Sequence, residues 1–295
     1  MRILLTGSSG FLGGALARHW IARGHNLWLL ARPTSRLDRL ADLPDSVRVV
    51  RASVAEEIKA AVRLASPDAI VHTACSYGRK GETALDVMDA NLHLGAVLLQ
   101  AVLDKPLGEY GPTTFLNTGT VLESTVNLYA LSKTQFSAWG AQLATHAPEQ
   151  LRFIDIRLQQ MYGPGDDRSK FTTHVIEACR NNELRLALTP GEQRRDFIHI
   201  DDVVRAYECI LERRCEFAAS DAVEVGSGTA VTMRSFVELA KQAADASTLL
   251  DFGAVPYRAN EAMLCVADTD RLRGLGWQPK VQLADGIKST IDSLR

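Results

Sequence analysis

The sequence lacks the cysteine patterns that mark metal sites and redox pairs. Its five cysteines, an odd number among 295 residues, are scattered and never form C-x-x-C or C-x-x-C-H. A chain of this length does not depend on disulfides for its core. We therefore expect no metal site, and reduced thiols in a cytoplasmic protein.

Long apolar runs and a surplus of one charge are also missing. No run approaches the roughly 20 residues that span a bilayer, and the apolar start over residues 3–5 is too short for the core of a signal peptide. The 33 basic and 35 acidic side chains give a net charge of -2, which does not favour nucleic acid or a membrane as the partner. The composition, 46% hydrophobic and 23% charged, is that of a folded globular protein.

The first half alternates short apolar runs with helical stretches, the pattern of a parallel sheet with crossover helices. We expect an α/β fold in which six or seven strands form one doubly wound, Rossmann-type sheet. A predicted helix over residues 11–23 comes after the first strand and ends at Gly24. The predicted strands cover residues 3–5, 27–30, 47–50, 69–71, 114–116 and 153–156.

The regular alternation of strands and helices ends after Gly163-Pro164-Gly165, where a predicted helix over 171–181 and a predicted strand near 184–188 begin a smaller mixed α/β lobe. We predict a large domain over residues 1–165 and a second lobe over residues 166–295. The β-rich segments 197–200 and 223–225 are expected to return to the large sheet.

Three glycines lie at the junction of the first strand and the first helix, at G-x-x-G-x-x-G spacing. Such a turn lets a pyrophosphate approach backbone N–H groups at the positive end of the helix. A turn that only permits close packing is the alternative, but its place at a strand-to-helix junction favours a dinucleotide. The predicted cofactor contacts here are Gly7, Ser9, Gly10, Phe11, Leu12 and Gly13.

The end of the second strand indicates which dinucleotide binds. NAD sites usually have Asp or Glu there to bond the ribose 2′-hydroxyl, whereas this segment has no carboxylate before Asp38. Arg32, supported by Ser35 and Arg36, can pair with a 2′-phosphate that an acid would repel. We predict that NADP(H) is preferred over NAD(H), the alternative being a solvated basic loop.

Tyr129 and Lys133 stand four residues apart and share one face if residues 129–144 are helical. Lowering the pKa of a tyrosine from about 10 to about 7 requires roughly 4 kcal/mol of preferential stabilisation of the phenolate. A close lysine and an oxidised nicotinamide can share that task. By itself the pair also describes a half-buried tyrosine beside a solvated lysine.

Ordered motifs extend over nearly the whole chain: T-G-S-S-G-F-L-G at 6–13, V-H-T-A at 71–74, Asn91 before a helix, F-L-N-T-G-T at 115–120, Y-A-L-S-K at 129–133, R-L-Q-Q-M-Y-G-P at 157–164 and R-D-F-I-H-I-D-D-V at 195–203. Together they resemble the extended short-chain dehydrogenase/reductases, a family of nucleotide-sugar epimerases, dehydratases and reductases. The resemblance implies an NAD(P)-dependent oxidoreductase whose large domain binds the cofactor, with Thr73 among the contacts, and whose smaller lobe binds the substrate.

The same resemblance implies the catalytic roles. Thr118 would hydrogen-bond the reacting oxygen, Tyr129 would exchange the proton, and Lys133 would bond the nicotinamide ribose. Thr120, in the same N-T-G-T segment, is a rival for the hydroxyl role, and Tyr129 follows Thr118 by only 11 positions, which leaves the choice between them open. Asn91 is similar to a helix asparagine that supports proton relay in the family, with a capping or buried amide as the alternative.

Substrate contacts are implied by the resemblance as well. Gln160 stands where the family commonly has Asn, and it keeps the amide one methylene further out. Lys170 and Arg195 lie in stretches similar to those that hold the substrate diphosphate. A surface lysine and an Arg–Asp brace are the alternatives for these two. Tyr77, with Arg79 and Lys80, is a weaker candidate for the sugar end.

The two residues directly after Thr118 narrow the reaction type. Dehydratases of this family have Asp-Glu there, where this chain has Gly119-Thr120, so dehydration is disfavoured. Segments 127–133 and 188–197 look most like the deoxyhexose-nucleotide branch, such as the CDP-abequose and CDP-paratose synthases. That resemblance implies NADPH-dependent reduction of a 4-keto sugar nucleotide in deoxysugar biosynthesis.

Two alternatives remain at this point. One is an NAD-dependent nucleotide-sugar 4-epimerase, and the other is a cofactor-binding sensor without turnover, which the intact Thr, Tyr and Lys disfavour. The resemblance also implies that two copies can pair as a homodimer through helices flanking the active site.

Overall fold

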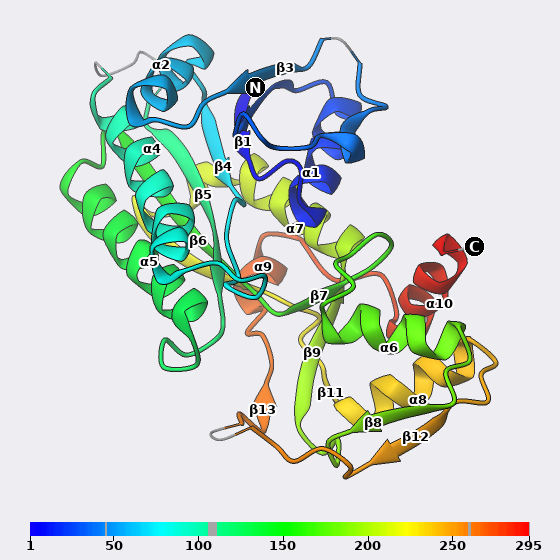
Figure 1. Cartoon of the computed structure of the whole chain (residues 1–295). Helices are drawn as coiled ribbons and strands as arrows, with labels where there is room; N and C mark the ends of the chain where they lie inside the picture. Colours follow the sequence, from blue (N-terminus) through cyan, green and yellow to red (C-terminus); the bar gives the residue numbers. More distant parts are fainter. Residues whose placement is uncertain (45, 106–110, 259–260, 295) are drawn as a thin grey trace. The chain divides into compact units, whose positions relative to one another are not determined.

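The computed structural model describes residues 1–44, 46–105, 111–258 and 261–294, which form two compact units (Figure 1). The first unit consists of Met1–Arg157 and Glu208–Val223, and the second of Leu158–Tyr207 and Glu224–Arg295. The assignment of the cofactor to residues 1–165 and of the substrate to residues 166–295 stays a prediction.

The first unit is built on a seven-stranded sheet with the strand order β10-β6-β5-β4-β1-β2-β3. β1 pairs in parallel with both β2 and β4, so the chain changes its direction of winding beside the central strand. The predicted Rossmann-type sheet is therefore confirmed. Its strands are β1 (Arg2–Thr6), β2 (Asn26–Ala31), β3 (Arg48–Arg51), β4 (Ala69–His72), β5 (Thr113–Thr120), β6 (Leu151–Leu158) and β10 (Ser220–Val225).

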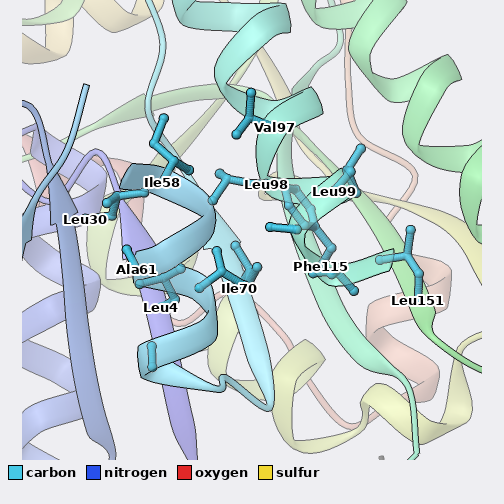
Figure 2. Packing of buried hydrophobic residues seen from close by; sticks show 14 of the residues in the cluster. Leu4, Leu30, Ile58, Ala61, Ile70, Val97, Leu98, Leu99, Phe115 and Leu151 are labelled. Atoms are coloured by element: carbon cyan, nitrogen blue, oxygen red, sulfur yellow. The ribbon is translucent and has the colours of Figure 1, made fainter. Parts of the chain in front are cut away.

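Helices cover both faces of this sheet because successive side chains of each strand point to opposite faces. Leu4, Ile70 and Phe115 point toward Ile58 and Leu98 of the covering helices, as Figure 2 shows, and all five are at most 5% exposed. The helical elements before the second unit are α1 (Phe11–Ala22), η1 (Asp38–Leu40), α2 (Ala55–Ala65), α3 (Ala84–Met88), the π-helical turn η2 (Asp89–His93), α4 (Leu94–Leu103) and α5 (Leu128–His146).

The last part of the first unit returns to α1. Glu208, near the end of α7 (Ile200–Glu212), is buried and accepts a hydrogen bond of 2.6 Å from Nε1 of Trp20 in α1. The turn η3 (Arg214–Glu216) then leads into β10. This buried contact between residues 188 positions apart in the sequence fixes the two helices together.

The second unit has its own core. Its larger sheet has the order β11-β9-β13 with β7 also paired to β9, and β12 pairs with β8. Phe197 stacks on Phe236 with ring centroids 4.3 Å apart in the centre of that core. The elements are β7 (Gln160–Tyr162), α6 (Phe171–Arg180), β8 (Arg185–Leu188), β9 (Arg194–His199), β11 (Ala230–Thr232), α8 (Met233–Ala243), β12 (Leu249–Phe252), β13 (Leu264–Cys265), α9 (Asp270–Gly274) and α10 (Leu283–Ser293).

The two segments expected to return to the large sheet behave differently. Segment 223–225 lies in β10, at the edge of the seven-stranded sheet. Segment 197–200 is a correction, because residues 197–199 lie in β9 of the second sheet, where β7 and β11 provide backbone partners. Within the described ranges, no helix is both long and apolar enough to cross a membrane.

Candidate active site

The glycine turn lies at the carboxyl end of β1 and requires glycine for steric reasons. Gly7 has φ +72°, and a Cβ there would lie 2.5 Å from the backbone nitrogen of Ala74 after β4. A Cβ on Gly13 would lie 2.2 Å from the carbonyl oxygen of Gly7. Gly10 donates to the same carbonyl at 2.9 Å and precedes the first residue of α1, so the helix begins without a capping side chain. The predicted contacts Ser9, Phe11 and Leu12 occupy this turn and the first two positions of α1.

The ends of β1 and β4 are joined by hydroxyl groups. Thr73 Oγ1 donates to the carbonyl oxygen of Thr6 at 2.7 Å, and Thr6 Oγ1 lies 2.8 Å from Nδ1 of His72. Burial, with a smaller contribution from the positive charge of Lys133, lowers the pKa of His72 to about 3. His72 is therefore neutral at physiological pH. Thr73, a predicted cofactor contact, thus connects the carboxyl ends of β1 and β4 through its hydroxyl group.

The loop after β2 carries the residues predicted for a 2′-phosphate. Arg36 pairs with Asp38 at 2.7 Å, and both side chains are largely exposed. The Arg32 guanidinium is exposed, and no described residue forms an ion pair with it. Arg51, which the sequence motifs did not identify, donates to three carbonyl groups of this loop.

Tyr129 lies in the first turn of α5, which begins where Asn127 Oδ1 accepts a hydrogen bond of 2.8 Å from the Ala130 nitrogen. Burial raises the pKa of Tyr129, and the nearby Cys75 acts in the same direction. A hydrogen bond with Thr120 acts in the opposite direction. Thr118 precedes Thr120 by two strand positions and therefore points to the same face of the sheet. Both candidate hydroxyls thus face the same side of β5.

Lys133 is 1% exposed, and its Nζ has no hydrogen-bond partner among the described residues. Burial lowers the pKa of this ammonium, while Cys75 and Asp155 raise it. A buried ammonium without a hydrogen bond is costly, so a ligand that supplies acceptors here would satisfy it. The i, i+4 spacing places Lys133 one helical turn beyond Tyr129.

Asn91 connects the loop after β4 to the catalytic helix. It lies in η2, is fully buried, and its Oδ1 accepts from the Ser76 nitrogen at 2.7 Å. Its Nδ2 donates to the Ser76 carbonyl and to Ser132 Oγ, each at 2.9 Å. The buried-amide interpretation describes this side chain, and its part in proton relay stays a prediction.

Tyr77 comes directly after Ser76 and contacts the candidate catalytic tyrosine. The rings of Tyr77 and Tyr129 have centroids 4.8 Å apart and are tilted by 33°. The Arg79 guanidinium lies 5.4 Å from the centroid of the Tyr77 ring. The positive charge of Arg79 offsets a small part of the increase in the pKa of Tyr129 that burial causes. Tyr77 therefore touches the acid/base candidate, a contact that no sequence motif indicated.

A buried carboxylate lies behind the catalytic strand. Asp155 Oδ1 accepts from Asn117 Nδ2 at 2.7 Å and from Ser137 Oγ at 2.8 Å. A Cβ on Gly119 would lie 2.5 Å from the same oxygen, so Gly119 leaves room for this carboxylate. Sequence reasoning missed Asp155, and the glycine between two threonines was the available signal.

The predicted substrate residues of the second unit lie at the ends of its strands and beside α6. Gln160 is the exposed first residue of β7. Lys170 precedes α6 and pairs at 2.9 Å with the buried Asp166, whose pKa burial raises and Lys170 lowers. Arg195 pairs with Glu261 and donates to the carbonyl of Arg194.

The Arg–Asp brace considered for Arg195 is not made with its neighbour. Asp196 is fully buried and accepts from the nitrogens of Ser227, Gly228 and Ala267 at 2.7–3.1 Å. Its acceptor oxygens therefore fasten β9 to two loops of the second unit.

Residues 3–226 match the NAD dependent epimerase/dehydratase family. The CDP-abequose synthase of Salmonella typhimurium is 29% identical over 304 residues, covering 99% of this chain and 98% of that protein. The dTDP-4-dehydro-6-deoxy-D-allose reductase of Streptomyces bikiniensis is 31% identical over 241 residues, covering 71% and 72%. A crystal structure of UDP-glucose 4-epimerase with UDP-glucose from Thermotoga maritima has a TM-score of 0.83 at 21% identity, covering 100% of this chain and 98% of that one.

These similarities extend over the sheet, the glycine turn and the Tyr129–Lys133 helix. They confirm the resemblance drawn from the motifs and the prediction of an NAD(P)-dependent oxidoreductase. The cofactor is accordingly a nicotinamide dinucleotide. The chain belongs to the NAD-dependent epimerase/dehydratase family, the extended short-chain dehydrogenase/reductases.

Proposed function

We propose that this enzyme reduces the C4 ketone of a nucleotide-diphosphate 4-keto-deoxyhexose, with NADPH as the reductant, in deoxysugar biosynthesis. The observation that carries the proposal is the buried Lys133 ammonium, which lacks a hydrogen-bond partner in the described part of the chain and lies one turn from Tyr129. Relatives named CDP-abequose synthase and dTDP-4-dehydro-6-deoxy-D-allose reductase support a deoxysugar nucleotide as the substrate class.

The chain's own residues fit the cofactor at two points. Gly7 and Gly13 leave the start of α1 bare, so a pyrophosphate can approach the helix N–H groups. The Lys133 ammonium has no hydrogen-bond acceptor among the described residues, and the ribose hydroxyls of the nicotinamide half can serve as its acceptors. When bound, the cofactor supplies the hydride that the carbonyl carbon requires. Arg32, which has no ion-pair partner among described residues, supports NADPH over NADH.

Tyr129 acts as the acid at the C4 oxygen. Burial raises its pKa, so the phenol keeps its proton until negative charge develops on that oxygen. A hydroxyl from Thr118 or Thr120 donates to the same oxygen and stabilises the charge where it forms. The positive charge of Lys133 stabilises the phenolate that remains after proton transfer. Asn91 bonds Ser132, between the two catalytic positions, and thereby holds α5 in register.

The second unit is proposed to hold the sugar nucleotide. Lys170 and Arg195 are its candidate cations for the diphosphate, and Gln160 is the candidate amide contact. Both cations are already paired with carboxylates, so binding of a diphosphate requires an exchange of partners. Tyr77 is proposed to contact the sugar through the ring surface that remains exposed beside Tyr129.

A second copy of the chain is the proposed protein partner. Leu128, Leu131 and Trp139 lie along α5 and are 53%, 38% and 65% exposed. An apolar stripe of this kind on a helix favours burial against another surface. Sedimentation of the wild type and of Trp139→Lys tests this homodimer. The five cysteines form no disulfide within the described residues, and we propose a reducing, cytoplasmic location.

The test is a coupled measurement of cofactor oxidation and sugar product. The protein is mixed with NADPH or NADH and with CDP- or dTDP-linked 4-keto-6-deoxy and 3,6-dideoxy sugars. We expect one NADPH to be oxidised per 4-hydroxy sugar formed, and no oxidation with Tyr129→Phe. Interconversion of two 4-hydroxy sugars without net NADPH oxidation would replace this proposal with the NAD-dependent 4-epimerase.

A further inference from the structure

Arg51 lies at the end of β3, directly beside Ala31 at the end of β2. Its Nη1 donates to the carbonyl oxygens of Arg32, Pro33 and Ser35 at 3.1, 3.0 and 3.2 Å. The Ser35 nitrogen also donates to the Arg32 carbonyl at 3.0 Å, which closes a four-residue turn. One guanidinium therefore clasps the turn after β2.

The clasp sets the direction of the peptide groups in this turn. In a trans peptide the N–H points opposite to the carbonyl of the preceding residue. Because the Pro33 and Ser35 carbonyls point to Arg51, the N–H groups of Thr34 and Arg36 point away from it. Amide groups oriented together in this way, with an arginine charge behind them, form a concavity that favours an anion.

Other charges around the turn do not replace Arg51. Arg36 is paired with Asp38, so its charge is largely compensated. Arg32 has an exposed guanidinium with no ion pair to a described residue. An exposed side chain loses conformational freedom when it binds, so a fixed backbone conformation at Arg32 lowers the cost of placing its guanidinium on a ligand. Arg51 fixes that backbone conformation, because it donates a hydrogen bond to the carbonyl of Arg32 itself.

We propose that Arg51 is a positioning residue that determines the preference for a 2′-phosphorylated dinucleotide. It holds the 32–35 turn so that the Thr34 and Arg36 amides, the Ser35 hydroxyl and the Arg32 guanidinium meet the 2′-phosphate together. Arg51 acts through the turn, because its Nη1 donates to three carbonyl groups of that turn. The inference rests on the NADPH preference proposed above.

Binding of adenosine 2′,5′-bisphosphate and of adenosine 5′-phosphate is measured by calorimetry for the wild type, Arg51→Gln, Arg51→Lys and Arg48→Gln. Arg48 is the matched control, since it lies in the same strand, loses the same charge, and has its guanidinium over the Trp28 ring instead of the turn. We expect Arg51→Gln to weaken the bisphosphate by about tenfold and the monophosphate by less than about twofold. Arg51→Lys should restore part of the difference, and Arg48→Gln should leave the ratio unchanged.

The outcomes separate the inference from the function on which it rests. A wild type that binds both nucleotides equally refutes the NADPH preference and the role of Arg51 with it. A wild type that discriminates, together with an Arg51→Gln protein that discriminates equally well, refutes the role of Arg51 alone. An equal loss in Arg48→Gln would also overturn it, because charge and not the turn would then be responsible. In the double variant with Arg32→Ala we expect a loss smaller than the two single losses combined, since both act on one site.

Discussion

Replacing Lys133 with methionine should make the cofactor-free protein more stable while it abolishes turnover. The ammonium is 1% exposed and has no hydrogen-bond partner in the described structure, so the folded state carries the cost of an unsatisfied charge. Methionine has a similar length and leaves little cavity. Replacing a buried ion pair with apolar residues of similar volume is often neutral or stabilising by about 1–4 kcal/mol, and for this ammonium without a hydrogen bond we expect a gain in that range at pH 7.

The pH dependence has a defined sign. Burial places the folded-state pKa of Lys133 below the ordinary value of 10.5. Below the folded pKa the penalty is complete, and it fades as the pH rises toward the unfolded value. The stability difference between Lys133→Met and the wild type should therefore shrink as the pH rises from 7 toward 10.5.

Urea denaturation of both proteins at pH 7 and pH 9.5, with and without NADPH, measures these differences. Lys59→Met is the control, because Lys59 pairs with Asp104 at 3.3 Å on α2 and its loss should cost at most about 1 kcal/mol. At about 100 times its dissociation constant, NADPH should stabilise the wild type by about 2.7 kcal/mol and the variant by less. A cofactor-free Lys133→Met protein that is less stable than the wild type at pH 7 would refute the reasoning.

Individual contacts support four more predictions. Tyr129→Phe should lower turnover by at least about 10² with nearly unchanged NADPH affinity, and near-normal turnover of the folded variant would contradict the assignment. Gly13→Ala should cost about 3 kcal/mol and weaken NADPH binding, as measured by denaturation and titration, because its Cβ would lie 2.2 Å from a backbone oxygen. His72 has a pKa of about 3 in the folded state and 6.5 in the unfolded state, so the free energy of unfolding should fall as the pH drops from 6.5 toward 3. In His72→Gln the fall between pH 6.5 and pH 4 should be smaller by about 3 kcal/mol. An unchanged dependence of stability on pH would refute this prediction. Asp196→Ala should lower the unfolding free energy by about 3–5 kcal/mol, since three backbone N–H groups lose their acceptor, and a loss below about 1 kcal/mol would count against that role.

The elements that the sequence predicted correctly are those whose signal is local. The apolar runs of the first half match strands of one sheet because the inner strands are buried on both faces and their runs are nearly continuous, whereas the edge strand β3 is mostly exposed. The prediction that segment 197–200 returns to the large sheet was wrong because its signal is not local. An apolar β-rich run does not say which strand will offer it a partner, and β7 and β11 are brought to it only by the fold of the second unit.

The candidate site divides in the same way. The spacing of Gly7, Gly10 and Gly13 and of Tyr129 and Lys133 was readable because each group lies within one turn or helix. The contact between Tyr77 and Tyr129 was not readable, because a loop 52 positions earlier in the chain reaches the helix only after the sheet has formed. Glu261, the carboxylate partner of Arg195, stands 66 positions further along the chain and likewise carries no spacing signal that separates it from other acids.

By itself the sequence determined the family, the winding of the main sheet and the short-range chemistry of the glycine turn and the catalytic helix, because residues close in the chain keep their spacing in any fold. Tertiary structure alone decided that His72 is neutral, that Lys133 is buried without a hydrogen-bond partner among the described residues, and that Arg51 clasps the turn after β2. Each of these depends on burial or on contacts between separate strands and loops. Such contacts exist only once the strands have paired and water has been excluded from between them.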